Sequence, residues 1–223
     1  MGQALSFSVF SGKYRISVFF FLSVSRLAFG SEPGIPPGTD LSRIYNKPRV
    51  ISSSISWEAT EDKSRWIVMD ADVHVFSDIP FEKLCAVSRD MKNFSVFFKR
   101  LKKADVRGLG SSSLFEMLVS VGLMGINYET AYTMYVTEPV NIPGCLLIDY
   151  SFFSGDGLVK NDAHGTWYLE AVSLNGIPGA YIRYTAHGVV LKKYPLQETI
   201  MDMFVNMEHV EIMNQFLRAG GNQ

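Results

Sequence analysis

From residue 103 to residue 191 the chain is a succession of strand-like segments with no helical spacing between them, and this limits the folds available to it. The segments are rich in β-branched and aromatic residues and are separated by glycine, proline and asparagine. Successive strands that lack a crossover helix pair antiparallel. We therefore predict an antiparallel sheet with strands at roughly 103–109, 113–121, 127–138, 145–154, 163–173 and 180–191.

A further strand and two short helices are predicted before these segments. Trp66–Phe76 is β-branched and aromatic, and the segment 77–80 interrupts it. Asp78 is placed to accept the free backbone N–H groups of a new helix, and Pro80 sits where a missing N–H group costs nothing. We expect that helix to turn Leu84 inward and a second short helix to follow at Met91–Leu101.

One long helix follows the sheet. From Pro195 onward, apolar residues recur every three or four positions until the Gly220-Gly221 pair, which is typical of a helix with one apolar face. A sheet needs a cover over its apolar face, and no other long helix is predicted in the chain. We predict an α+β fold in which a curved antiparallel sheet of about six or seven strands wraps around this C-terminal helix.

The first thirty residues have the three-part pattern of a secretory signal peptide. Lys13 and Arg15 precede an apolar run at 16–24, and small residues follow at positions 28 and 30. The apolar run is shorter than the roughly 20 residues that a transmembrane helix needs. We expect a secreted or periplasmic protein. The alternative is myristoylation of Gly2, which would place the protein on a cytosolic membrane surface.

Residues 31–65 are predicted to be an extension ahead of the folded domain. Four of the nine prolines fall between residues 33 and 48. Proline fixes φ and has no N–H donor, so this part is expected to be extended and poorly packed. Apolar residues then alternate with serines near Trp57, which predicts a possible edge strand. The predicted folded domain is 66–218, and 219–223 is a short tail.

Four segments of the predicted domain carry a resemblance to a known superfamily. They are Ile79-Pro80-Phe81-Glu82-Lys83-Leu84, Arg89-Asp90-Met91-Lys92-Asn93-Phe94, Gly165-Thr166-Trp167-Tyr168-Leu169 and Ile182-Arg183-Tyr184. In their order and spacing they resemble the helix-grip (SRPBCC) superfamily of START domains, birch-pollen-allergen relatives, polyketide cyclases and dehydrases, and coenzyme-Q-binding proteins. The resemblance covers 66–218 and does not separate the subfamilies.

The resemblance implies a cavity between the sheet and the C-terminal helix that holds a lipid, sterol, isoprenoid or polyketide-like molecule. Alternation along each strand places one apolar series on the face toward the helix. The predicted ligand-binding residues are Met117, Tyr132, Met134, Tyr150, Phe152, Trp167, Tyr184, Met203, Phe204 and Met207. Methionine and aromatic side chains give adaptable walls for an apolar ligand. The alternative is that the same residues pack as an ordinary core.

The search for catalytic chemistry is mostly negative. The four histidines show no i, i+4 pair for zinc, and the chain has no Gly-x-Ser-x-Gly elbow and no phosphate-binding glycine loop. We predict no metal, no cofactor and no catalytic residue. Cyclases of the superfamily use pocket side chains to move protons, and the candidates here are Tyr150, His164, Arg183 and His187. If Ile182 and Tyr184 line the cavity, alternation turns Arg183 to solvent.

Three functions therefore stay open. The first is an exported protein that binds and carries a hydrophobic small molecule or lipid. The second is an enzyme of the cyclase, dehydrase or hydrolase kind on the same scaffold. The third is a protein-interaction module whose cavity is filled by large side chains.

The charge balance bears on the partners. With 21 basic and 22 acidic residues, the net charge of -1 argues against nucleic-acid binding. A basic cluster follows the second short helix: Lys99, Arg100, Lys102, Lys103 and Arg107. One interpretation is transient contact with anionic lipid headgroups, and the other is a solvated helix end.

The loop at 155–162 joins two central strands of the predicted sheet. In the superfamily that it resembles, loops at this end flank the cavity mouth. Leu158 and Val159 are therefore candidates for a mobile lid or a membrane contact. The alternative is an ordinary hairpin loop.

Overall fold

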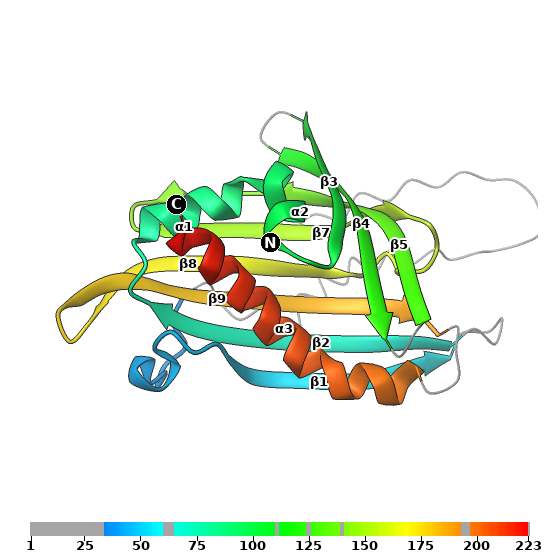
Figure 1. Ribbon diagram of the computed structural model, residues 1–223, viewed down its shortest axis with the longest axis horizontal. Coiled ribbons are helices and arrows are strands. Elements are labelled where there is room, and N and C mark those ends of the chain that lie inside the picture. Colours follow the sequence, from blue (N-terminus) through cyan, green and yellow to red (C-terminus); the bar gives the residue numbers. More distant parts are fainter. Residues whose placement is uncertain are drawn as a thin grey trace, which may run out of the picture. The chain divides into compact units, whose positions relative to one another are not determined.

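The strands form one antiparallel sheet, and the long C-terminal helix crosses it diagonally (Figure 1). The strand order is β1-β2-β9-β8-β7-β5-β4-β3, and β6 pairs with β7. The strands are β1 (Arg49–Ala59), β2 (Arg65–Ser77), β3 (Leu101–Leu109), β4 (Ser112–Leu123), β5 (Ile126–Thr137), β6 (Asn141–Ile142), β7 (Cys145–Gly155), β8 (His164–Leu174) and β9 (Ile177–Leu191). The helices are η1 (Leu41–Ile44), α1 (Phe81–Arg89), η2 (Met91–Asn93), α2 (Phe94–Phe97) and α3 (Gln197–Gly221).

This computed structural model describes residues 34–59, 65–109, 112–123, 126–138, 141–192 and 197–222. Of residues 109, 121–123, 126–128, 141, 198, 200 and 202–204 it describes the backbone only. All described residues belong to one compact unit, Pro33–Gln223. The predicted signal peptide at 1–30 lies outside the described residues. None of the described helices combines the length and the apolarity needed to span a bilayer.

The predicted α+β class and the position of the long helix are confirmed, but the predicted number of strands was too low. The described part of the chain forms nine strands. The edge strand expected near Trp57 is present as β1, which pairs antiparallel with β2, whereas the two-residue β6 was not predicted. β1 lies beneath α3, as β2 does, whereas β6 is too short to leave a periodic signal in sequence.

The helix α1 begins where it was expected, but without the predicted cap. Pro80 occupies the N-cap position, and no side chain caps the helix. Asp78 instead accepts hydrogen bonds from Tyr45 Oη at 2.8 Å and Asn46 Nδ2 at 3.0 Å. Asp78 therefore does not cap α1. Its carboxylate instead holds the segment around Tyr45 and Asn46 next to the end of β2 by hydrogen bonds.

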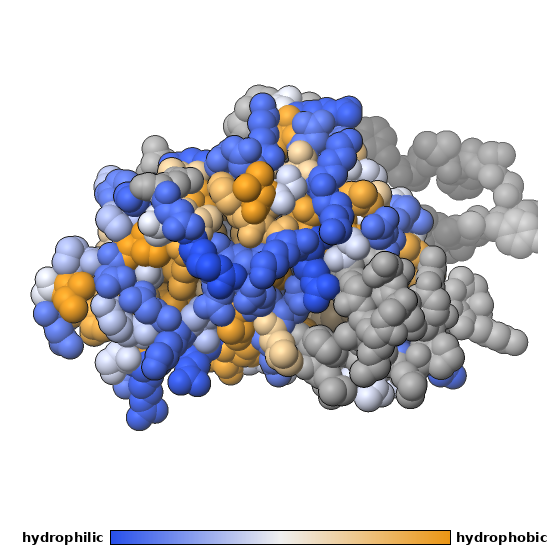
Figure 2. Space-filling view, in the orientation of Figure 1, coloured by the Kyte–Doolittle hydropathy of each residue, from blue (hydrophilic) through white to orange (hydrophobic). Residues whose placement is uncertain are grey.

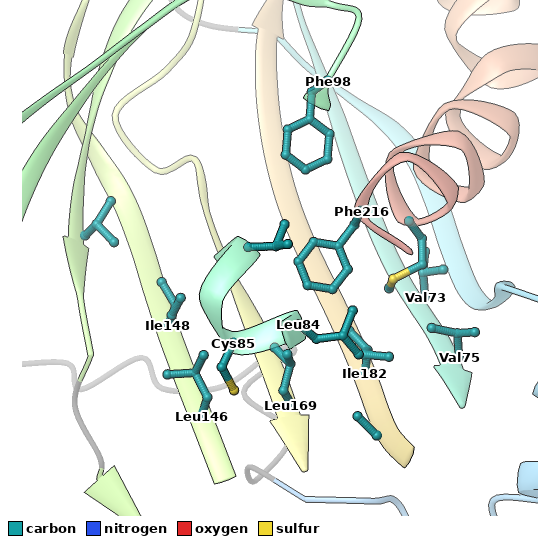
Figure 3. Packing of buried hydrophobic residues seen from close by; sticks show 14 of the residues in the cluster. Val73, Val75, Leu84, Cys85, Phe98, Leu146, Ile148, Leu169, Ile182 and Phe216 are labelled. Atoms are coloured by element: carbon teal, nitrogen blue, oxygen red, sulfur yellow. The ribbon is translucent and has the colours of Figure 1, made fainter. Parts of the chain in front are cut away.

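The main core lies between the inner face of the sheet and the helices. Figure 3 shows Leu84 of α1 and Phe216 of α3 beside Ile182 of β9, and all three side chains are almost fully buried. Val73 and Val75 of β2 belong to the same cluster, which shows that alternate residues of each strand point inward. Burial of this apolar surface, at about 25 cal/mol per Å², is the main contribution to stability.

Residues 34–48 pack on the outer face of the sheet, contrary to the prediction of a poorly packed extension. Asp40 caps the short helix η1 through Ser42, and the helix turns Ile44 inward. Ile44 is 4% exposed and forms a second apolar cluster with Phe76 and Tyr181. Prolines remove backbone donors, but they leave neighbouring apolar side chains able to pack. The outer face is therefore partly covered.

A buried network of polar groups lies on this outer face. Asp72 accepts from Arg183 Nε at 2.9 Å and Arg183 Nη2 at 2.6 Å, and from the ring of His74 at 2.8 Å. The other ring nitrogen of His74 lies 2.9 Å from the Tyr181 hydroxyl. Arg183 does point away from Ile182, as alternation predicted, but it is 7% exposed rather than solvated. The prediction that it faces solvent was wrong because Arg183 is bound by the buried Asp72 carboxylate of the neighbouring strand.

We predict that Asp72 stabilises the fold in a pH-dependent way. Burial raises the pKa of Asp72, but hydrogen bonds from His74 and Arg183 outweigh burial and lower the pKa from 3.8 to about 2. The stabilisation, about 2 kcal/mol, is therefore present above pH ~4 and is lost as the pH falls from about 4 to 2. Asp72→Asn should lower the free energy of unfolding by about 3 kcal/mol at pH 7 and abolish this acid-dependent loss. Urea unfolding at several pH values measures both.

The control is Glu58→Gln, which breaks the ion pair with Lys160. That pair is 2.6 Å long, and Glu58 is half exposed, so its loss should change the free energy of unfolding by less than about 1 kcal/mol. Equal losses in the two variants would contradict the importance of burial for the Asp72 network.

Candidate functional site

A cavity of about 230 Å³ lies between the inner face of the sheet and the helices. The strands β3, β4, β5, β7, β8 and β9 provide most of its wall, and α1, η2, α2 and α3 complete it. Ile212 is the contribution of α3. Most lining side chains are apolar or aromatic, as in pockets that hold small organic molecules. The cavity shows that the described core is not filled by large side chains.

Six of the ten predicted ligand-binding residues line this cavity. All six lie on strands and share the inward parity: Met117, Tyr132, Met134, Tyr150, Trp167 and Tyr184. Strand alternation therefore identified the correct face of the sheet.

The other four predicted residues are placed differently. Phe152 packs against the core cluster and is not among the cavity-lining residues. Met207 of α3 is 64% exposed, because its side of the helix has turned to solvent at that point. The side chains of Met203 and Phe204 lie outside what the structure describes.

Several lining residues were missed. Phe115, Val119, Val136 and Ile148 share the parity of predicted neighbours on their strands, so alternation alone could have found them. The lining residues on or next to helices have no period-two signal, and whether they face the cavity depends on how the helices dock on the sheet. They are Ser88, Met91, Phe94, Phe98 and Ile212. Arg100 and Leu101, at the start of β3, complete the set.

Three tyrosines meet inside the cavity wall. Tyr150 of β7 reaches across β8 and donates to the carbonyl oxygen of Thr185 on β9 at 2.9 Å. The phenol of Tyr184 lies within electrostatic range of both Tyr150 and Tyr132. Burial raises the pKa of all three phenols, so each keeps its proton and remains a hydrogen-bond donor at physiological pH.

Gly165 makes the long reach of Tyr150 possible. A Cβ atom at this position of β8 would overlap both the Tyr150 hydroxyl and the Thr185 carbonyl oxygen. A strand glycine with such neighbours marks a close approach of another group. The Gly165 position therefore fixes how Tyr150 lies in the cavity wall.

A stack of rings forms the wall beneath α3. The Trp167 ring centroid lies 4.5 Å from that of Tyr184 and 4.7 Å from that of Phe216. His209 of α3 lies 5.8 Å from Tyr184, and burial lowers the pKa of His209. The imidazole is consequently neutral at pH 7 and suits the apolar surroundings.

Polar contacts fasten α3 to the chain at the rim of the cavity. Arg100, a cavity-lining residue, donates to Glu208 from Nε at 2.9 Å and from Nη2 at 3.0 Å. The backbone N–H group of Lys99 donates to Gln215 Oε1 at 2.8 Å. Figure 2 shows hydrophilic side chains gathered on this face over α3 and the start of β3, with hydrophobic ones between them. The cavity is thus bordered by a polar surface.

The basic cluster is partly neutralised by this arrangement. Arg100 pairs with Glu208, Arg107 lies 3.1 Å from Glu116, and Lys99 lies 3.9 Å from a carboxylate on α3. A contact with anionic lipid headgroups stays a prediction.

The loop at 155–162 is anchored instead of forming a free lid. Val159 makes a bridge to Val190 of β9 and is 9% exposed. Lys160 donates its N–H group to the Val189 carbonyl at 2.8 Å and pairs with Glu58. The loop therefore continues the hydrogen bonding along β9 past the end of β8. A mobile lid would lack these bonds, and an ordinary hairpin loop would not reach β9.

The candidates for acid–base chemistry are divided between the two faces of the sheet. Tyr150 lines the cavity, whereas Arg183 and His187 are on the outer face with Asp72 and Asp70 as partners. The ring of His164 lies against that of His187, 4.8 Å away. Three of the four candidates therefore cannot reach the cavity. Among the described residues, no group of three or more potential ligands is arranged for a metal ion.

Comparisons with known proteins agree with this architecture. No family model and no curated protein matches the sequence. A STAR-related lipid transfer protein from Xanthomonas axonopodis matches with a TM-score of 0.50 and 13% identity, over 74% of this chain and 98% of that one. Human STARD10 matches with a TM-score of 0.50 and 11% identity, over 74% of this chain and 72% of that one. The fold is the START-like helix-grip fold.

We predict that Gly165→Ala displaces Tyr150 and lowers the free energy of unfolding by about 2 kcal/mol, because the added methyl group has no space. Gly188→Ala on β9 is the matched control, since its Cβ would lie 3.6 Å from Met69 Cε, an ordinary contact. Its effect should stay below about 1 kcal/mol. Urea unfolding with near-UV circular dichroism measures both variants, and equal effects would contradict the close approach.

Proposed function

We propose that this protein binds a hydrophobic small molecule or lipid in the cavity between the sheet and α3 and acts as its carrier. The observation that carries the proposal is an apolar cavity of about 230 Å³ that the core leaves unfilled. Apolar wall atoms that face an unfilled space lack the van der Waals contacts of a packed core. An apolar occupant would supply these contacts and remove the wall from water.

The cavity wall favours binding over catalysis. Among the described residues that line it, Arg100 alone carries a charge, and that charge is engaged by Glu208. The remaining polar atoms are mainly phenols that keep their protons. General acid–base catalysis needs a group that exchanges a proton near the working pH. This wall offers a surface for apolar contact and hydrogen bonding instead.

The solved structures support the same class of function. The Xanthomonas axonopodis protein is described as a lipid transfer protein, and its fold is shared here over 74% of this chain. The signal-peptide pattern at 1–30 leads us to propose that the carrier is exported and works outside the cytoplasm.

Native mass spectrometry of the protein, purified from its natural source, tests the proposal. We expect a stoichiometric apolar molecule that is released by solvent extraction. Filling the cavity should abolish its retention, and Val119→Phe does this because Val119 lines the cavity. Leu118→Phe is the matched control, since its side chain points to the opposite face of β4.

Two results would contradict the proposal. One is a protein that carries no apolar molecule and binds none when fatty acids, isoprenoids and phospholipids are added. The other is equal retention of a ligand by both phenylalanine variants, which would place the binding site elsewhere.

A further inference from the structure

Tyr132 is partly buried in the cavity wall, and its hydroxyl group has no hydrogen-bond partner among the described residues. Tyr150, by contrast, donates to Thr185, and most buried hydroxyls in proteins find such a partner. The Tyr132 hydroxyl makes no hydrogen bond to any residue that the structure describes. Its ring lines the cavity and packs against the core cluster. A phenol without a hydrogen-bond partner among the described residues therefore lies at the proposed binding site.

Leaving this hydroxyl unpaired is costly. A donor or acceptor that is removed from water without a partner typically lowers the free energy of unfolding by about 1–3 kcal/mol. Phenylalanine at the same position has no hydroxyl group and would avoid this desolvation penalty. The neighbouring wall residues Met117 and Met134 offer no strong acceptor. A ligand oxygen in the cavity would supply the missing partner.

The size of the cavity limits what such a ligand can be. An apolar cavity of about 150 Å³ holds one benzene molecule. The volume here is about 230 Å³, and pockets for drug-sized ligands begin at about 300 Å³. A two-chain phospholipid has many times the atoms of benzene and does not fit this volume. A molecule of one or two fused rings, or a short branched isoprenoid, fits.

The charge of the wall limits the ligand as well. An ionised carboxylate or phosphate beside Tyr132 would be removed from water with no cation to pair with, because the guanidinium of Arg100 at the rim is already bound to Glu208. A neutral carbonyl or hydroxyl group needs one hydrogen bond, which the Tyr132 phenol donates or accepts.

We propose that Tyr132 is the polar recognition group of the cavity, and that the ligand is a compact, neutral, mainly apolar molecule with one carbonyl or hydroxyl oxygen. This inference rests on the proposed function, since it names the ligand class of the same cavity.

Equilibrium dialysis of the full chain with four probes tests the inference: naphthalene, the neutral ketone 2-acetylnaphthalene, the anion 2-naphthoate, and palmitate. We expect the ketone to bind most tightly. Tyr132→Phe should weaken ketone binding about three- to tenfold and leave naphthalene binding unchanged, because one neutral hydrogen bond is lost. Tyr135→Phe, on the opposite side of β5 and 37% exposed, is the matched control and should change neither.

Thermal unfolding of the ligand-free protein adds a second readout. A tyrosine that only supports the structure would lose stability when its hydroxyl is removed. The unpaired hydroxyl predicts that Tyr132→Phe leaves the melting temperature unchanged or raises it.

The outcomes separate the two proposals. If naphthalene binds but Tyr132→Phe affects both naphthyl probes alike, the role of Tyr132 is overturned and the carrier function stands. If 2-naphthoate or palmitate binds most tightly, the neutral, compact ligand class is overturned and the carrier function again stands. If no probe binds, and vesicles of phosphatidylcholine donate no lipid, both proposals fail.

Discussion

The packing of the C-terminal half of α3 on the inner face of the sheet determines what the rest of the molecule can do. Phe216 is 1% exposed and stacks on Trp167, and Met213 is fully buried beside it. Gly220 lets α1 approach closely, because a Cβ there would lie 2.7 Å from Leu84 Cδ2. This end of the helix closes the core. Toward its middle, α3 contributes only Ile212 to the cavity wall among the described residues, and the cavity lies between this part of the helix and the sheet.

The sheet separates two kinds of chemistry on its two faces. Alternation places phenols, methionines and aromatic rings inside, and it places the charged partners Asp72 and Arg183 outside. The charged pair crosses from β2 to β9, two strands that pair with each other from Trp66 to Ser77 of β2. A slip of one residue between these strands would move Arg183 into the cavity and Tyr184 out of it. The polar network therefore contributes to the register that keeps the cavity apolar.

Sequence could predict what depends on periodicity and could not predict what depends on docking. Period two along the strands was enough to place Tyr132, Tyr150 and Trp167 in the cavity wall. Period 3.6 along the last helix was not enough to place Met207, because a stripe on a long helix can leave the sheet before the helix ends. Arg183 is buried together with its partner Asp72, which lies 111 positions away in sequence, and no local pattern links the two.

The unfavourable features of the molecule are concentrated in one place. The unfilled space and the unpaired Tyr132 hydroxyl both lie at the cavity, whereas the bidentate Asp72–Arg183 pair lies on the outer face of the sheet. A random defect would have no reason to combine an apolar void with an unsatisfied donor in its wall. A ligand that binds only the folded state stabilises it in proportion to RT ln(1 + [L]/Kd). The fold therefore has the form expected of a domain whose core is completed by a bound apolar ligand.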